Sequence, residues 1–302
     1  MTILLTGASG FVGAAFLKKL QREGCDVRAL SRAFEMSKET NFATALDGIG
    51  TVVHLAARAH VMQDAHADPL AAYRAVNVEG TLNLARQAAV AGVTRFVFVS
   101  SVKVNGERTE VGQAFTEADI PKPQDAYGIS KHEAELGLRE LAADTGMQIV
   151  IVRPPLVYGP GVRANFASLM TVVKRGWPLP LARVDNKRSL VALGNLVDFL
   201  FLCTSAPQAA NQTFMVSDGC DVSTPELIKH MARAMGVREH LFPIPVAVLK
   251  VVSKLFGKTA AVQRVCESLQ VDISKAQNLL GWTPPVPFDE GLRRAAAVCK
   301  HD

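Results

Sequence analysis

Residues 3–13, ILLTGASGFVG, combine a short apolar run with three glycines, Gly7, Gly10 and Gly13. The run is long enough for a buried β-strand, and residues 11–23 follow it with apolar side chains at helical spacing. A strand, a glycine turn and a helix in this order aim backbone N–H groups and the positive helix end at a pair of phosphates. We therefore predict a dinucleotide site here, with an ordinary turn between strand and helix as the alternative.

Further short apolar runs alternate with helical patterns along the first half of the chain. The runs are apolar nearly throughout, as is typical of strands covered on both faces. Strands that alternate with helices favour a parallel, right-handed, doubly wound sheet. We predict an α/β fold of this Rossmann-like kind, with strands at 3–5, 27–30, 51–55, 96–100 and 148–152 and helices at 11–23, 70–91 and 126–144.

The pattern changes after residue 158, where prolines become common and the alternation of strands and helices loosens. We predict a dinucleotide-binding domain over residues 1–158 and a smaller C-terminal α/β region over 159–302 that binds the substrate. Residues 214–216 predict a strand that returns to the main sheet. Residues 32–47 show no clear strand where a doubly wound half usually places its third one, so the sheet is short by a strand or this segment is irregular.

Composition narrows the class of protein. The chain has 302 residues, of which 49% are hydrophobic, so it can bury a sizeable core. Its net charge is +5, but the basic residues are scattered, which argues against nucleic-acid binding and suits an anionic small substrate. The five cysteines include no CxxC pair, so we expect a reduced cytoplasmic protein without a metal site. Because the first predicted strand begins at residue 3, we expect no signal peptide, and because no apolar run reaches the length of a membrane span, we expect none.

Residues 242–256 are mostly apolar, and Lys250, Lys254 and Lys258 recur in or just after them at helical spacing. This pattern predicts an ordinary amphipathic helix packed on the protein. Contact with a membrane surface is the alternative.

Tyr127 and Lys131 stand four residues apart at the start of a predicted helix, so they share one face about one turn apart. An ammonium group near a phenol stabilises the phenolate and lowers the phenol pKa. Such a tyrosine can give or take a proton near neutral pH. The alternative is a tyrosine and a lysine that merely share a helix surface.

The apolar run at 96–100 ends in two hydroxyl side chains, Ser100 and Ser101. In open α/β sheets, ligands bind beyond the carboxyl ends of the strands, so both hydroxyls lie at the predicted site. We expect Ser101 to contact a substrate oxygen beside Tyr127 and Ser100 to be structural or secondary, because one serine at such a place often only turns the chain.

Together, these motifs resemble the extended short-chain dehydrogenases/reductases of the nucleotide-sugar epimerase/dehydratase family. The resemblance covers nearly the whole chain. It rests on TGASGFVG at 6–13, HLAA at 54–57, NVEGT at 77–81, FVSS at 98–101, YGISK at 127–131, RPPLVYGP at 153–160 and LGWTP at 280–284.

The resemblance implies a role for each catalytic candidate. Tyr127 would be the acid/base, and Lys131 would bind the nicotinamide ribose and tune Tyr127. Ser101 would orient the reacting oxygen, and Asn77 would support the active-site helix. The implied substrate contacts are Ser101, Asn165, Leu181 and Arg188, of which Arg188 would clamp the diphosphate of a UDP-sugar.

The implied cofactor is NADP, with NAD as the alternative. The run at 27–30 ends in Ser31 and Arg32, and a hydroxyl followed by a guanidinium suits a 2′-phosphate better than the acidic residue that favours NAD. The cofactor-binding candidates are Gly7, Ser9, Gly10, Phe11, Val12, Gly13, Ser31, Arg32, Leu55, Ala56, Ala57, Ser100, Tyr127, Lys131, Pro154 and Val157.

Three features bear on the reaction. Val102 and Lys103 stand where dehydratases of the family carry an acidic pair, which disfavours 4,6-dehydration. SSVKVNG, with Asn105 where many epimerases have tyrosine, RPPLVYGPGVRANF and SLQVDISKA resemble bacterial reductases of UDP-linked 4-keto sugars in surface-polysaccharide synthesis. No late arginine matches the second phosphate clamp of the epimerases; Gln270 or Ser268 is nearest that place. We predict 4-keto reduction, with a UDP-hexose C4 epimerase and a non-catalytic NADP-binding sensor or scaffold as alternatives.

Two histidines and two helices complete the predictions. His54 lies within a predicted strand and is expected in the core, whereas His60 follows on a loop that could face the substrate. The helices at 81–91 and 127–143 resemble the pair that forms a four-helix dimer interface in this family. We therefore expect a homodimer, with burial of these helices in a monomer as the alternative.

Overall fold

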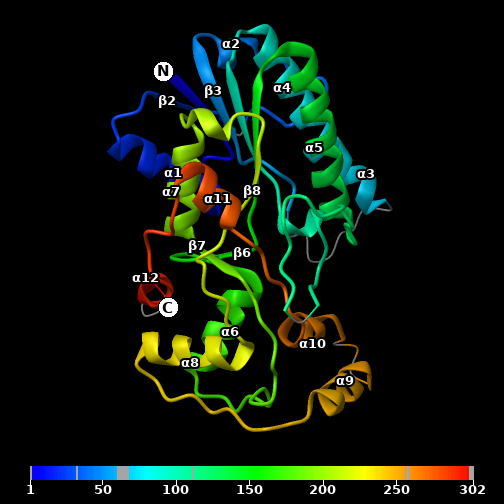
Figure 1. Ribbon diagram of the computed structural model, residues 1–302, viewed down its shortest axis with the longest axis vertical. Helices are drawn as coiled ribbons and strands as arrows, with labels where there is room; N and C mark the ends of the chain where they lie inside the picture. The colour runs from blue at the N-terminus through cyan, green and yellow to red at the C-terminus, as the bar shows by residue number, and fades with distance from the viewer. Residues whose placement is uncertain are drawn as a thin grey trace.

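A six-stranded parallel sheet forms the centre of the computed structural model (Figure 1). The structure describes residues 2–31, 33–59, 68–110, 112–255, 257 and 259–298. The sheet confirms the predicted doubly wound α/β fold. Its order is β2-β1-β3-β4-β5-β8, with β1 at Thr2–Thr6, β2 at Val27–Ala29, β3 at Ile49–His54, β4 at Arg95–Val99, β5 at Gln148–Arg153 and β8 at Thr213–Met215.

Helices cover both faces of this sheet, which is why its strands are apolar nearly throughout. Successive side chains of β1 point to opposite faces: Ile3 and Leu5 join one core and Leu4 joins the other. The first core is closed by α1 (Phe11–Arg22), α7 (Leu193–Cys203) and α11 (Ser274–Leu280). The second is closed by α2 (Ala43–Leu46), α4 (Thr81–Val90) and α5 (Ala126–Thr145).

The sheet is short by a strand on the side of β2, because the described residues between β2 and β3 form only α2. The intervening segment is held on α4 instead: Asn83 donates from Nδ2 to the carbonyls of Ser37 and Thr40, at 2.9 and 2.8 Å. Arg28 of β2 donates to the carbonyls of Ala45 and Asp47 at the end of α2, at 3.0 and 2.8 Å. The first of the two alternatives predicted for this segment is therefore the observed one.

The single helix predicted over residues 70–91 is divided into three parts. These are α3 (Pro69–Arg74), a π-helical turn η1 (Ala75–Gly80) and α4. A π turn inside a helix re-aims its side chains and is frequent at functional sites. The turn ends at Gly80, where a Cβ would lie 2.5 Å from the carbonyl carbon of Met36, so no larger residue fits there.

The C-terminal half adds a second, smaller layer below the sheet in Figure 1. A two-stranded parallel sheet, β6 (Leu156–Tyr158) with β7 (Leu190–Ala192), packs against α6 (Ala164–Lys174), α8 (Thr224–Met235) and α12 (Phe288–Val298). The predicted strand at 214–216 is confirmed as β8, which pairs in parallel with β5. The remaining elements are η2 (Val102–Val104), η3 (Pro207–Ala209), α9 (Val246–Leu255) and α10 (Thr259–Cys266).

Among the described residues, no helix is both long enough and apolar enough to cross a bilayer. In that same part of the chain, no group of three or more histidine, cysteine, aspartate or glutamate side chains could hold a metal ion.

Candidate active site

The turn between β1 and α1 is packed too tightly for side chains at two of its glycines. Gly7 has φ +68°, and a Cβ there would lie 2.7 Å from the amide nitrogen of Ala56. A Cβ at Gly13 would lie 2.0 Å from the carbonyl oxygen of Gly7. No side chain caps α1 at Gly10, which leaves the first N–H groups of the helix available to a ligand. The turn therefore fits the diphosphate of a dinucleotide.

A buried histidine fixes the segment that lies against this turn. Thr6 Oγ1 accepts from the amides of Leu55 and Ala56, so its O–H donates to His54 Nδ1 at 2.8 Å. Nε2 then carries the proton and donates to Thr81 Oγ1 at 2.9 Å. Burial, followed by the charge of Lys131, lowers the pKa of His54 to about 3. His54 is thus a neutral core residue, as predicted.

Lys131 joins α5 to the carboxyl end of β4. The helix begins at Asp125, whose side chain accepts from the Gly128 amide at 2.7 Å. One turn later Lys131 is buried, and its Nζ donates to the Val99 carbonyl at 2.8 Å. The same Nζ lies 5.9 Å from the ring centroid of Tyr127. Burial lowers the pKa of Lys131 to about 7.

The prediction that Lys131 lowers the pKa of Tyr127 is wrong for this structure. Burial raises the pKa of Tyr127 above its ordinary value, and the neighbouring Asp125 and Tyr73 raise it further. The physical reason is that the Lys131 ammonium is directed to the Val99 carbonyl and is itself easily deprotonated. Tyr127 therefore keeps its proton at neutral pH.

Ser100 and Ser101 both lie where β4 ends. Ser101 caps η2 by accepting from the Lys103 amide at 3.2 Å, and its own O–H is still able to donate. The Oγ of Ser100 is buried and has no hydrogen-bond partner among the described residues. A buried hydroxyl without a partner costs free energy that a bound ligand could offset.

Asn77 sits in the π turn and connects two parts of the site. Its Oδ1 accepts from the Arg58 amide at 2.8 Å, and its Nδ2 donates to Ser130 Oγ at 3.0 Å. Ser130 donates in turn to the Tyr127 carbonyl at 2.8 Å. Asn77 therefore reaches α5 through Ser130, next to Lys131.

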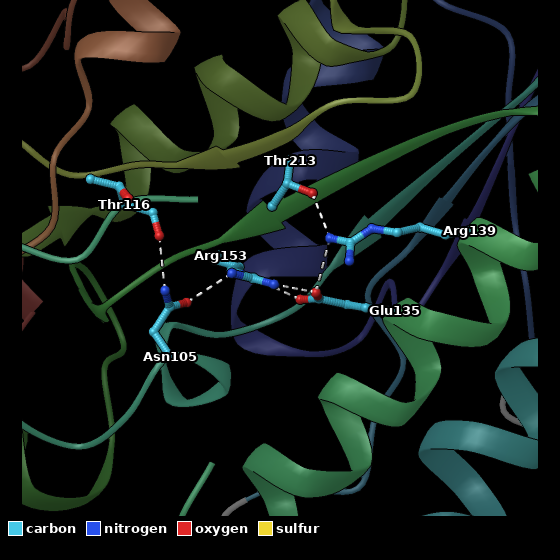
Figure 2. Close-up of polar contacts among 6 residues, drawn as sticks. All are labelled: Asn105, Thr116, Glu135, Arg139, Arg153 and Thr213. Carbon is cyan, nitrogen blue, oxygen red and sulfur yellow. Dashed lines mark hydrogen bonds and ion pairs between the residues drawn. The ribbon is translucent and has the colours of Figure 1, made fainter. Parts of the chain in front are cut away.

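A buried ion pair behind the site was not predicted. Arg153, the last residue of β5, donates from Nε and Nη2 to the two carboxylate oxygens of Glu135 at 2.9 and 2.5 Å (Figure 2). Its Nη1 donates to Asn105 Oδ1 at 2.9 Å. The pair thus links β5, α5 and the segment after Ser101. Two sequence features could have predicted this pair: the charged Arg153 at the end of an apolar strand and a glutamate one turn after Lys131.

The remaining cofactor candidates are spread around the turn. Ser9 and Gly10 are exposed, whereas Phe11, Val12 and the segment 55–57 are half-buried. Pro154 is buried, and its carbonyl accepts from the Val102 amide at 3.0 Å; Val157 lies half-buried in β6. Ser31 is exposed and accepts from the Ala33 amide. Arg32 and His60 lie outside the described residues.

The predicted substrate residues are in the C-terminal half. Asn165 is exposed in the first turn of α6, and Leu181 is buried in the core beneath it. Arg188 donates from Nη1 to the carbonyls of Arg264 and Glu267 at 2.8 and 3.1 Å, so it holds the end of α10. Burial lowers its pKa from the ordinary value.

Both candidates for a second clamp are engaged within the protein. Gln270 donates to Asp221 at 2.8 Å, and Ser268 Oγ accepts from the Lys187 amide at 3.0 Å.

The sequence of the chain matches a family model from residue 3 to residue 216, described as the NAD dependent epimerase/dehydratase family. The chain belongs to this family. It is 47% identical to a UDP-glucose 4-epimerase of Vibrio cholerae, over 98% of this chain and 94% of the relative. It is 28% identical to the N-acetyl-alpha-D-glucosaminyl-diphospho-ditrans,octacis-undecaprenol 4-epimerase of Escherichia coli O157:H7, over 97% of this chain and 93% of the relative.

Solved structures of the family have the same fold. The structure of MoeE5 in complex with UDP-glucose and NAD aligns with a TM-score of 0.78 and 25% identity, covering 100% of this chain and 99% of that one. The predicted membership of the extended nucleotide-sugar epimerase/dehydratase group is therefore confirmed, and the chain is an enzyme of that group.

Proposed function

We propose that this chain is an NAD(P)-dependent oxidoreductase acting at C4 of a UDP-linked hexose. The observation that carries the proposal is the position of Lys131: its Nζ lies 5.9 Å from the Tyr127 ring centroid and donates to the carbonyl of Val99, two residues before Ser101, in the same sheet as the glycine turn. The turn and the segment 55–57 would hold the cofactor, with Ser100 and Pro154 near its reactive ring. When bound, the cofactor supplies or accepts the hydride at C4.

The protein's own residues then manage the proton at the C4 oxygen. Tyr127 holds a proton and would donate it as negative charge develops on that oxygen. Ser101 would donate a hydrogen bond to the same atom. Lys131 would bind the ribose hydroxyls. Because burial lowers its pKa to about 7, small changes in its surroundings would shift Lys131 between its charged and neutral forms. Asn77 acts on these groups only by positioning α5.

Of the two directions for this chemistry, we propose net 4-keto reduction with NADPH in surface-polysaccharide synthesis. Reduction needs a proton donor at C4 in its only chemical step, and Tyr127 is in that form. No acidic residue stands directly after the strand at 27–30, where the sequence has Ser31 and Arg32 instead. Lys103 is ion-paired with Asp125, so Val102 and Lys103 provide no acid for 4,6-dehydration.

C4 epimerisation of a UDP-hexose is the second candidate. The relative from Vibrio cholerae favours it, since it is named a UDP-glucose 4-epimerase and is 47% identical. An epimerase would use Tyr127 first as a base and then as an acid, and would retain its NAD.

One set of assays separates these functions. Purified protein is denatured, the released cofactor is identified, and NADPH oxidation is followed with a UDP-4-keto-6-deoxy-N-acetylhexosamine. Steady NADPH oxidation supports the reductase. Retained NAD together with interconversion of UDP-glucose and UDP-galactose supports the epimerase. NADP binding without turnover on either class of substrate supports a sensor or scaffold instead.

We propose further that residues 1–158 bind the cofactor and residues 159–302 bind the UDP-sugar through Asn165, Leu181 and Arg188. Substituting Arg188→Met should weaken UDP binding in titration calorimetry and leave NADPH binding unchanged. A homodimer through α4 and α5 is also proposed, because Val90 and Leu136 on these helices are exposed. Its test is the mass measured by light scattering.

A further inference from the structure

Helix α9 exposes its apolar side chains and buries a polar one. Val248, Val251, Val252 and Leu255 are between 44% and 78% exposed. The buried residue on α9 is Ser253, whose Oγ donates to the Lys250 carbonyl at 2.8 Å. The sequence predicted an ordinary amphipathic helix with its apolar face on the protein, and the structure places the larger part of that face in solvent.

The four exposed side chains form one continuous surface, which we call the α9 stripe. Their spacing of i, i+3, i+4 and i+7 aligns them along one side of the helix. Leu249 lies on the opposite side and packs with Val246 against the C-terminal core. The stripe is therefore fixed in orientation, since the other side of α9 is held by the protein.

Positive charge borders the stripe. Lys254 lies next to the stripe on the helix surface, and Lys250 lies one turn earlier and farther round the helix; both are exposed, and none of the ion pairs among the described residues involves either lysine. The sequence has no aspartate or glutamate from residue 240 to residue 266, but it has Lys258 and Arg264 in addition to these lysines. An apolar stripe with a cationic border and no carboxylate is complementary to a surface that is apolar inside and anionic outside.

We propose that the α9 stripe docks this chain on an anionic lipid bilayer, with α9 lying in the plane of the headgroups. The helix has 10 residues, which corresponds to a length of about 15 Å and is too short to span a hydrocarbon core. Its valines and Leu255 would enter the acyl boundary, while the lysine stems reach the phosphates. Figure 1 shows α9 at the periphery, away from the central sheet, so docking there leaves the sheet uncovered.

A second copy of the chain fits this surface less well. Two copies paired through the stripe would bring their lysine borders together with no carboxylate between them. Like charges placed opposite each other disfavour such an interface. An anionic lipid surface instead gains from each lysine, by about fivefold in affinity.

The test is co-sedimentation of the full chain with vesicles of phosphatidylcholine alone and of an equimolar mixture with phosphatidylglycerol. We expect binding to the mixed vesicles only, weakened by high salt. The variant V251E/L255E should bind more than about tenfold more weakly, and K250Q/K254Q about 25-fold more weakly, because two attractive charges are lost. Ile120→Glu is the matched control, since Ile120 lies outside α9 and is 77% exposed. This variant should bind the vesicles as strongly as the unmodified chain does.

Three results would overturn the proposal. One is equal binding of V251E/L255E and the unmodified chain to the mixed vesicles, and another is binding by neither. The third is a change of mass in ultracentrifugation from dimer to monomer on V251E/L255E substitution, which would assign the stripe to a second copy. Thermal unfolding of each variant confirms that it is folded. Neither readout depends on turnover, so the result is independent of the proposed reaction.

Discussion

Helices α5 and α9 both contain lysines and aliphatic side chains, yet they bury opposite kinds of residue. Within the described part of the chain, α5 buries Lys131 and Glu135 against the sheet, whereas α9 exposes Val251 and Leu255. Burying charge and exposing apolar surface both cost free energy unless a partner is present. On α5 the partners are visible: the Val99 carbonyl and Arg153. On α9 the partner is the proposed bilayer. Departures from ordinary burial therefore make both places candidates for function.

The largest effect is expected at the reacting end of α5. Tyr127→Phe removes the proton donor and leaves the shape of the site, so turnover should fall by about 10²–10⁴-fold. Cofactor binding, followed by thermal shift with NADPH and NAD, should be retained. If Tyr127→Phe kept most of the turnover rate, Tyr127 would not be the proton donor of the reaction.

Breaking the buried ion pair is the next test. Arg153→Met leaves the Glu135 carboxylate buried without its main partner, and the free energy of unfolding should fall by about 3–5 kcal/mol in urea titrations. Replacing both residues by methionine should recover most of this loss. Arg74→Met is the control. It breaks an exposed ion pair between Arg74 of α3 and Glu133 of α5, so the free energy of unfolding should fall far less. If Arg153→Met and Arg74→Met lowered the free energy of unfolding equally, the expected difference between a buried and an exposed ion pair would be contradicted.

Lys131 predicts a pH dependence of stability. Below pH 7 the folded and unfolded chains both hold the Lys131 proton, so the cost of its buried charge is fully present. Between about pH 7 and 10.5 only the unfolded chain holds it, so stability rises with pH relative to a Lys131→Met variant. Unfolding free energies of both proteins across this range give the difference. A flat difference would mean that the buried ammonium costs nothing.

The smallest effect is expected on α9. Leu255→Ser alters a side chain that is 78% exposed, so the free energy of unfolding should change by less than about 0.5 kcal/mol. Leu138→Ala on α5, where the side chain is fully buried, should cost about 2–5 kcal/mol. Comparable losses would show that the stripe is covered by the protein itself.

The sequence predicted the sheet well because a strand covered on both faces must be apolar. The runs at 51–55 and 96–100 differ from β3 and β4 by at most two residues at an end. The π turn was missed, since Asn77 and its neighbours have an ordinary helical pattern and only the close approach of Gly80 to Met36 marks the place. The order of Gly7, Tyr127 and Lys131 led to the prediction of a site at the strand ends, which remains a prediction.

Orientation is what the sequence could not supply. The pairing of Tyr127 with Lys131 was read correctly as one helix face, but the direction of the ammonium toward Val99 depends on where β4 ends in space. The pKa prediction was wrong for that reason. Likewise, the periodicity of residues 242–256 gives an apolar side but does not say whether that side meets the protein or the solvent.

The missing strand beside β2 has a consequence for the behaviour of the protein in concentrated solution. An edge with free N–H and C=O groups can recruit a strand from a neighbouring chain and start aggregation. Here the edge strand is only 3 residues long, and the guanidinium of Arg28 reaches from it to the last carbonyls of α2. A short edge strand that carries a fixed cation is a poor template for a further strand, so the enzyme can end its sheet at β2 without becoming prone to aggregation.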